Sequence, residues 1–244
     1  NIQYVISDGE VYVLEVNPRS SRTVPFLSKI TGVPMANLAM KGILGESLKS
    51  KGYETGLIEE SKNVYTKVPV FSFQKLKDVD TTLGPEMKST GEVMGSDENL
   101  EKSLYKGLVS AGIKVKDQGS VLFTISGTAK EEAYGLAKRF SDLGYHIMAT
   151  KGTAKYFEDK GLHVETVGKI DEEGKYEHDV LGLIYKGLVD MVINTAAKKK
   201  TARNDGFKIR RAASEQEIAC LTSLDTTDAL LKVLESISFN VSSI

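Results

Sequence analysis

The second half of the chain alternates short apolar runs with amphipathic stretches, and this alternation restricts the fold more than any other feature. The amphipathic stretches carry apolar residues at helical spacing, as at Ala133, Leu136, Ala137 and Phe140. Strands joined by helical stretches of about 10–15 residues form a parallel sheet with helices on both faces. The sequence therefore predicts a three-layer α/β domain with a mainly parallel sheet, whose strands lie at 121–125, 145–149, 163–167 and 191–193.

Polar residues follow each of these predicted strands. In an open parallel sheet, ligands bind beyond the carboxyl ends of the strands. Thr150-Lys151-Gly152-Thr153 lies at a predicted helix N-terminus, where free N–H groups and the helix dipole favour an anion. Ser126-Gly127-Thr128 with Lys130, then Lys169, then Asn194-Thr195 follow the other strands. Thr150 alone is most simply a helix N-cap, but the set together predicts a phosphate site.

A second polar group ends an apolar run near the start of the chain, in the segment EVNPRSSRT. Glu15 and Asn17 are two residues apart on a predicted strand, so their side chains share one face. Oxygen ligands of this kind suit Mg²⁺, and Arg19 and Arg22 could then bind phosphate or carboxylate oxygens. The alternative interpretation is a strand end with ordinary surface charges.

The same segment is predicted to form a hairpin. Two β-prone runs, 1–6 and 11–16, flank Asp8-Gly9, a strong turn signal. With a two-residue loop, Gln3 would oppose Leu14 and point away from Glu15. We expect instead a three-residue loop, residues 8–10, which places Gln3 opposite Glu15.

The rest of the first half mixes helical and strand signals. The pattern predicts a helix at 35–44, a strand at 65–73 and a helix that starts at Ser96 and ends near Gly112. Lys116-Asp117-Gln118-Gly119 is the best domain boundary, so we expect one domain over 1–115 and another over 116–244.

Composition excludes several classes of function. Lys plus Arg number 32 against 33 Asp plus Glu, so no bulk charge favours nucleic acid or a membrane surface as a partner. Cys220 is the single cysteine, which excludes an intrachain disulfide and fits a reducing, cytoplasmic compartment. Its apolar neighbours predict a buried thiol.

Two motifs in the first half carry a family resemblance. Gln3 with residues 15–29 (EVNPRSSRTVPFLSK), Thr31-Gly32-Val33-Pro34, and residues 83–95 (LGPEMKSTGEVMG) resemble the second ATP-grasp unit of the carbamoyl phosphate synthetase large chain. The resemblance implies that residues 1–115 are the C-terminal portion of an ATP-grasp (α+β) domain. It also implies that the lobe that binds adenine lies upstream of residue 1. By the same resemblance Gln3, Glu15 and Asn17 are ligands of Mg²⁺ or Mn²⁺, Gln3 and Glu15 also bind ATP, and Arg19 and Arg22 stabilise carbamate and the transferring phosphoryl group.

The second half resembles the methylglyoxal synthase-like allosteric domain that ends the same large chain. The resemblance implies a site for phosphorylated nucleotides such as UMP or IMP, made by Lys130, Thr150, Thr153, Lys169 and Asn194. Thr222 matches a position that helps to bind ornithine. Ala196 stands where relatives that bind uridylate carry a threonine, and other members respond to acetylglutamate, so the effector stays open.

The resemblance implies a parent enzyme that makes carbamoyl phosphate from bicarbonate, glutamine-derived ammonia and two ATP. It would serve pyrimidine and arginine biosynthesis and work with a glutamine amidotransferase small chain. We expect this segment to be inactive alone. One alternative is a stand-alone module that binds an effector without catalysis. A weaker alternative is a methylglyoxal synthase-type lyase, for which a G-G-D-type loop is missing between Lys169 and Asn194.

Overall fold

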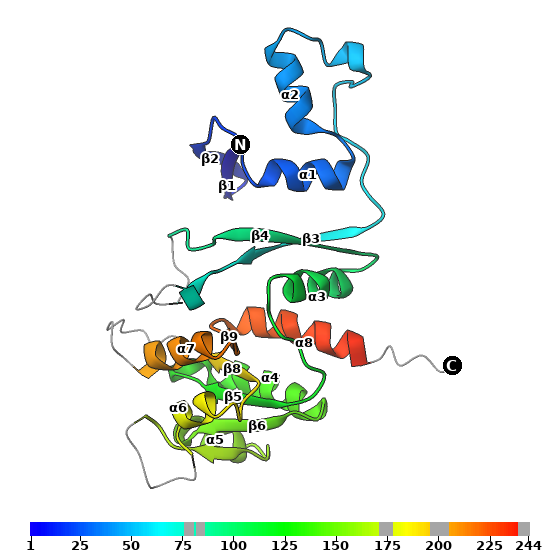
Figure 1. Cartoon of the computed structure of the whole chain (residues 1–244). Helices are drawn as coiled ribbons and strands as arrows, with labels where there is room; N and C mark the ends of the chain where they lie inside the picture. The colour runs from blue at the N-terminus through cyan, green and yellow to red at the C-terminus, as the bar shows by residue number, and fades with distance from the viewer. Residues whose placement is uncertain (76–80, 82–85, 171–177, 196–204, 239–244) are drawn as a thin grey trace.

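The computed structural model describes residues 1–75, 81, 86–170, 178–195 and 205–238 (Figure 1). A β-hairpin and two helices lie at one end, a two-stranded sheet with one helix lies in the middle, and an α/β domain lies at the other end. In the described residues, no helix is both long enough and apolar enough to cross a bilayer.

The α/β domain is built on a five-stranded sheet in the order β7-β6-β5-β8-β9, and every neighbouring pair is parallel. The predicted parallel sheet is therefore confirmed, and β9 is a strand that the sequence pattern did not reveal. The strands are β5 Ser120–Thr124, β6 His146–Thr150, β7 Glu165–Val167, β8 Met191–Asn194 and β9 Ala219–Leu221.

Helices cover both faces of this sheet, which confirms the three-layer architecture. One core lies between the sheet and the first group of helices, α4 Lys130–Asp142, α5 Lys151–Glu158 and α8 Leu224–Ser238. The other core lies between the sheet and α6 Val180–Tyr185 with α7 Asp205–Glu215. Residues of β5 alternate between the two cores: Val121 and Phe123 enter the first, and Leu122 enters the second.

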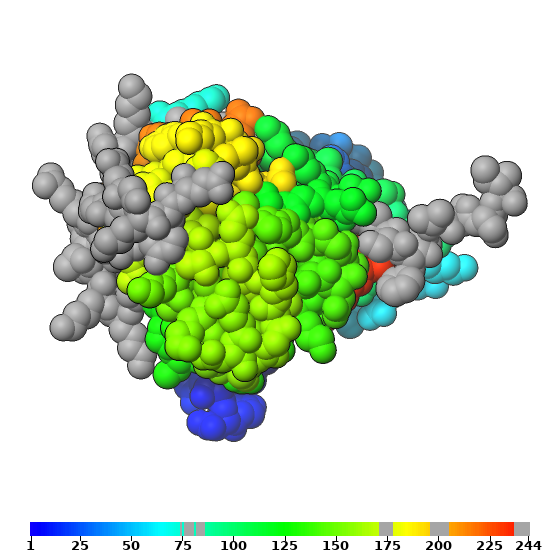
Figure 2. All heavy atoms as spheres, turned by 90° about the horizontal axis from the view of Figure 1, so that it is seen from below, coloured from blue at the N-terminus to red at the C-terminus, as the bar shows by residue number. Residues whose placement is uncertain are grey.

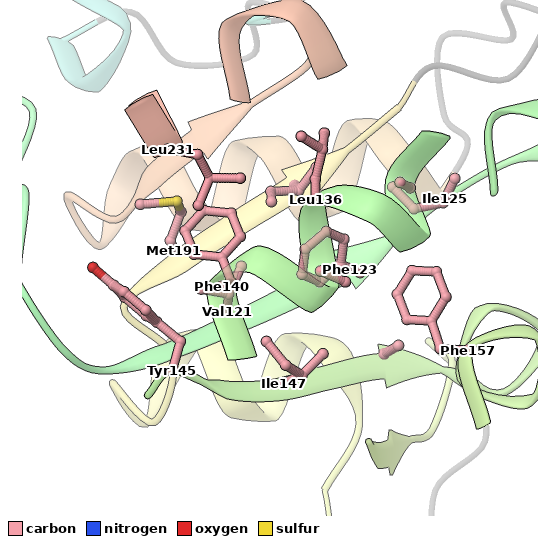
Figure 3. Close-up of a cluster of buried hydrophobic side chains, with 14 of the residues drawn as sticks. Val121, Phe123, Ile125, Leu136, Phe140, Tyr145, Ile147, Phe157, Met191 and Leu231 are labelled. Atoms are coloured by element: carbon pink, nitrogen blue, oxygen red, sulfur yellow. The ribbon is translucent and has the colours of Figure 1, made fainter. Parts of the chain in front are cut away.

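Aromatic packing fixes the first core around β5 (Figure 3). The ring of Phe123 meets Phe140 of α4 and Phe157 of α5 edge-to-face, with centroids 6.2 and 5.6 Å apart. Such pairs add to the burial of apolar surface, which is the main stabilising contribution. Leu231 of α8 joins this core, so the last described helix is part of the domain.

The middle unit consists of β3 Val64–Val70, antiparallel to β4 Gly91–Asp97, with α3 Leu100–Ser110 packed on both. The expected helix start at Ser96 is wrong, because β4 continues through Asp97. Asn99 caps α3 instead, and its side chain accepts a hydrogen bond from the Lys102 N–H at 2.9 Å. Helix α3 also packs on α8, so this unit contacts the α/β domain (Figure 1).

The backbones of β4 and α3 approach each other closely because β4 has a glycine, Gly95, at the contact. A Cβ added at Gly95 would lie 1.9 Å from the Ser103 carbonyl oxygen and 2.8 Å from the Gly107 nitrogen. Both of these atoms belong to the backbone of α3, so they cannot move aside cheaply. A Cβ at Gly91, in the same strand, would meet only Val70 Cβ at 3.7 Å, an ordinary contact.

We predict that Gly95→Ala lowers the free energy of unfolding by about 1–3 kcal/mol or more, because the methyl group overpacks the α3 contact. Gly91→Ala, the control in the same strand, should be neutral or slightly stabilising. Urea unfolding of both variants measures the change in free energy. Equal unfolding midpoints for the two variants would contradict the close contact at Gly95.

The segment between α3 and β5 is fastened to the sheet by Asp190. Its carboxylate accepts hydrogen bonds from Lys116 Nζ at 2.5 Å and from the Ser120 N–H at 2.9 Å. Partial burial opposes ionisation, but these donors lower the pKa of Asp190 below its ordinary value. Tyr145 donates to the Lys116 carbonyl, and burial raises its pKa to about 12. The proposed boundary at this segment stays a prediction.

We predict that Asp190→Asn lowers the free energy of unfolding by about 1 kcal/mol at neutral pH, since the partly exposed pair is screened by solvent. A carboxyl with a depressed folded pKa stabilises above its unfolded pKa and loses that effect as pH falls through the folded pKa. The difference between the two proteins should therefore shrink below about pH 4. Urea unfolding from pH 3 to 8 tests this, and a difference independent of pH would contradict it.

The N-terminal end holds the hairpin, β1 Ile2–Ser7 and β2 Glu10–Val16, and the helices α1 Thr23–Thr31 and α2 Met35–Ile43. The predicted helix at 35–44 is confirmed. Short 3₁₀ turns lie at Lys49–Lys51, Phe73–Lys75 (η2) and Gly127–Ala129 (η3). Seen from the side of the α/β domain, the dark-blue hairpin protrudes beyond its rim (Figure 2).

One face of the hairpin is entirely apolar. The cross-strand pairs Ile2–Val16, Tyr4–Val13 and Ile6–Val11 share this face because directly paired residues point to the same side. All six side chains are exposed, with Ile6 the most at 72%. Exposed apolar surface of this extent is typical of an interface with further protein.

Candidate functional site

The hairpin register brings the first predicted site together. Gln3 pairs directly with Glu15, as expected, but not by the expected route. The loop has two residues, Asp8 and Gly9, both with positive φ, so the predicted three-residue loop is wrong. A bulge at Leu14 restores the register, because Tyr4 pairs with Val13 while Gln3 pairs with Glu15. The extra residue turns Glu15 to the face of Gln3.

Asn17 lies beside Glu15 on that face. Its Nδ2 donates to Glu15 Oε1 at 2.9 Å. The backbone of Asn17 is held to Asn1 by the hydrogen bond from its N–H to the Asn1 carbonyl at 2.8 Å. Gln3, Glu15 and Asn17 thus form a small cluster of one carboxylate and two amides at the open end of the hairpin.

This donor set fits part of a magnesium site. The three side chains offer oxygen atoms, which Mg²⁺ and Mn²⁺ prefer, and a rotation of the Asn17 amide would present its oxygen as well. Among the described residues, no group of three or more His, Cys, Asp or Glu side chains could hold a metal. Phosphate oxygens and water would complete the coordination here.

The two predicted arginines follow this cluster on the chain. Arg19 is exposed, and its Nη1 donates to the Ser20 carbonyl at 3.2 Å. Arg22 is exposed at the N-cap position of α1. Both arginines follow the end of β2 closely in the sequence. Among the described residues, neither guanidinium group is hydrogen-bonded to Glu15 or Asn17. Their predicted role at the phosphoryl group stays a prediction.

The second predicted site lies at the carboxyl edge of the five-stranded sheet. The helices that follow the parallel strands β5 and β8 pack on opposite faces of the sheet. The order in which strands are added therefore reverses between these two neighbours, which makes a topological switch point. A crevice forms beyond the strand ends at such a switch point, and it is the usual ligand site of open α/β sheets. The Ser126 N–H donates to Thr195 Oγ1 at 3.0 Å and joins the two loops there.

Helix α5 begins at this edge beside the first loop. Thr150 occupies its N-cap position without a capping hydrogen bond from the helix to its side chain, so the simple N-cap interpretation of its hydroxyl does not hold. Lys130 Nζ donates to the Gly152 carbonyl at 2.7 Å and so lies against the first turn of α5. An ammonium group and a helix N-terminus together favour a bound anion.

Thr153 and Asn194 are buried at the same edge. Thr153 is 1% exposed, and its hydroxyl contacts the backbone N and O of Ile125 at 3.4 and 3.3 Å. Asn194 is 3% exposed, and its Nδ2 donates to Thr124 Oγ1 at 2.7 Å. Both side chains therefore hold the carboxyl end of β5 in place, and their role in binding an effector stays a prediction.

Lys169 and Thr222 lie at opposite ends of this edge. Lys169 follows β7 and Thr222 follows β9, the two outer strands of the sheet. Four strand spacings separate those strands, which is about 19 Å. One nucleotide cannot readily contact both Lys169 and Thr222. Asn194 ends β8, which lies between β5 and β9, so it is nearer to Thr222 than Lys169 is.

Arg210 also lies at this edge, although the sequence analysis did not assign it as a ligand. It is 5% exposed on α7, and its Nη1 donates to Asn194 Oδ1 at 2.8 Å. The signal was present, because Ile209, Ala212 and Ala213 are spaced as a buried helix face and Arg210 lies beside them. Ala196 and the basic residues 198–200 and 203 lie outside the described residues.

Cys220 is not a reactive group of this site. It lies in β9 at the edge of the second core, and burial raises the pKa of its thiol to about 12. A thiol with this pKa is protonated at neutral pH and a poor nucleophile. This agrees with the structural role expected for Cys220, a buried and unreactive thiol.

Comparison with known proteins assigns one segment in each half of the chain. Residues 1–51 match the family of the carbamoyl-phosphate synthase L chain ATP binding domain, and residues 132–222 match the MGS-like domain. Among solved structures, the crystal structure of ForH is similar at 20% identity and a TM-score of 0.35, covering 49% of this chain and 78% of that chain. A likeness this distant carries no argument. The two family matches, in this order, confirm the resemblance: the chain matches the C-terminal region of a carbamoyl phosphate synthetase large chain.

Proposed function

We propose that this chain serves an enzyme that makes carbamoyl phosphate from bicarbonate, glutamine-derived ammonia and two ATP. In this proposal the hairpin supplies part of the site that phosphorylates carbamate, and the α/β domain binds a regulatory effector. Ammonia would come from a glutamine amidotransferase small chain. The match to an ATP-binding domain over residues 1–51 supports ATP as the substrate.

One observation carries the catalytic part of the proposal. The bulged register places Gln3 opposite Glu15, and Asn17 lies 2.9 Å from the Glu15 carboxylate. These side chains would hold Mg²⁺ or Mn²⁺ against the polyphosphate, and the ion would neutralise charge on the phosphate oxygens. Gln3 and Glu15 would also line the ATP site. Phosphoryl transfer needs positioning and charge neutralisation more than covalent chemistry from the protein.

The arginines would contribute the remaining positive charge. Arg19 and Arg22 are exposed, so both guanidinium groups can reach a substrate without breaking a buried contact. A guanidinium binds carboxylate or phosphate oxygens through two parallel hydrogen bonds. The exposed apolar face of the hairpin also fits the proposal, because a larger ATP-binding unit would cover it.

We predict that Glu15→Gln, in a synthetase whose large chain contains this segment, lowers carbamoyl phosphate synthesis by about 100-fold or more, the size expected for a lost electrostatic group in a transition state. ATP hydrolysis that depends on bicarbonate alone should persist. The control is Glu10→Gln, at the other end of the same strand. Normal synthesis by the Glu15 variant would refute the assignment.

The regulatory part rests on the carboxyl edge of the sheet. Lys130 lies against the first turn of α5, and the buried Asn194 contacts Thr124 at the carboxyl end of β5. These are donors suited to a phosphate group, so the proposed effector is a phosphorylated nucleotide such as UMP or IMP. Thr222 lies at the far end of the edge and would serve a different effector, such as ornithine. Acetylglutamate is a further candidate for this domain.

We predict that the 244-residue chain binds UMP or IMP in calorimetry without turning over ATP. Lys169→Ala should weaken binding about tenfold or more through loss of a charged hydrogen bond to phosphate. Lys155→Ala is the matched control, because Lys155 lies on α5 but pairs with Asp159 on the helix surface. Equal affinity for all three proteins would exclude Lys169 from the site.

A further inference from the structure

A buried arginine stands behind the predicted effector site. Arg210 lies on α7, on the opposite side of the sheet from α5, and only 5% of it is exposed. Its neighbours Ile209, Ala212 and Ala213 belong to the second core. Burying a charged side chain is costly unless its donors are satisfied, so such a residue needs a specific polar partner. Asn194 is one such partner, at 2.8 Å.

The contact determines which way the Asn194 carboxamide faces. A guanidinium can only donate hydrogen bonds, so the atom 2.8 Å from Arg210 Nη1 must be the amide oxygen. The amide nitrogen then points to Thr124 Oγ1, at 2.7 Å, at the carboxyl end of β5. This nitrogen carries two hydrogens, and Thr124 accepts one of them. The amide is therefore fixed from both sides, by α7 and by β5.

We propose that Arg210 is a positioning residue of the effector site, a role that rests on the proposed function. It holds the Asn194 amide so that its second N–H is donated to a phosphorylated effector at the switch point. Its charge lies behind this donor, where screening by solvent is weak, and adds positive potential to that of the half-buried Lys130 and the exposed Lys169. The predicted ligand class is a phosphate monoester.

The neighbouring arginine provides a matched control. Arg211 is on the same helix and its side chain is only 13% exposed, but it points elsewhere. Its Nε donates to Glu215 at 2.7 Å, and its Nη1 donates to the Phe73 carbonyl in η2 at 3.3 Å. An arginine-to-lysine substitution makes the same chemical change at both positions. A difference between the two variants therefore reports on the effector site and not on helix α7 in general.

The test is calorimetric titration of UMP and of IMP into four proteins: the unchanged chain, Arg210→Lys, Thr124→Val and Arg211→Lys. We expect affinity to fall about tenfold or more in Arg210→Lys, because a single ammonium cannot replace the guanidinium contact. Thr124→Val removes the other anchor of the amide and should weaken binding in the same direction. Arg211→Lys should bind within about twofold of the unchanged chain, since it keeps the amide anchored.

A spectroscopic readout separates positioning from simple loss of stability. The side-chain NH₂ resonances of Asn194 should shift in Arg210→Lys and stay in place in Arg211→Lys, even without nucleotide. Thr124→Val covers the case in which Arg210→Lys does not fold. If the unchanged chain binds and the folded variants at Arg210 or Thr124 bind as tightly, the positioning role is wrong while the proposed function stands. If the unchanged chain binds neither nucleotide, the proposed effector site fails, and this inference fails with it.

Discussion

The burial of β5 on both of its faces is the constraint on which the second half of the chain depends. All five residues of this strand are buried, and its apolar residues Val121, Leu122 and Phe123 alternate between two separate cores. Helices must therefore cover both faces of the sheet, and the order in which strands are added reverses beside this strand. At this switch point the chain leaves β5 and β8 toward opposite faces of the sheet, and polar groups lie just beyond the ends of both strands. The predicted effector site is a consequence of how the hydrophobic core is divided.

The sequence predicts this part of the fold well, because four of its strands are short β-prone segments between amphipathic helices, and 121–125 and 191–193 are mostly apolar. It does not predict β4 or β9. Residues 91–97, GEVMGSD, have little β propensity, and they form a strand because β3 offers its edge and Gly95 allows α3 to approach. The three-residue β9 is defined by its pairing with β8. Both strands owe their existence to contacts that are distant in sequence.

The hairpin shows how a correct site prediction can rest on a wrong local detail. Asp8-Gly9 forms the two-residue turn that its sequence favours, which by itself would turn Gln3 away from Glu15. The bulge at Leu14 corrects the register by one residue. No residue type marks such a bulge clearly, so a local pattern predicts the turn but not the pairing beyond it. The family resemblance implies separately that Gln3 and Glu15 share a ligand, and the observed pairing agrees with it.

The adjacent arginines of α7 connect the two halves of the chain physically. Arg210 contacts Asn194 at the carboxyl edge of the sheet, while Arg211 contacts the Phe73 carbonyl of the middle unit. One helix thus touches both the predicted effector site and the segment that follows β3. Energetic coupling between sites needs an element whose position both sites affect, and contact alone does not establish it. A shift of α7 on effector binding would change both contacts together, because the two arginines belong to one rigid helix. Helix α8 also contacts the middle unit, through α3, but it enters the core on the other side of the sheet from α7.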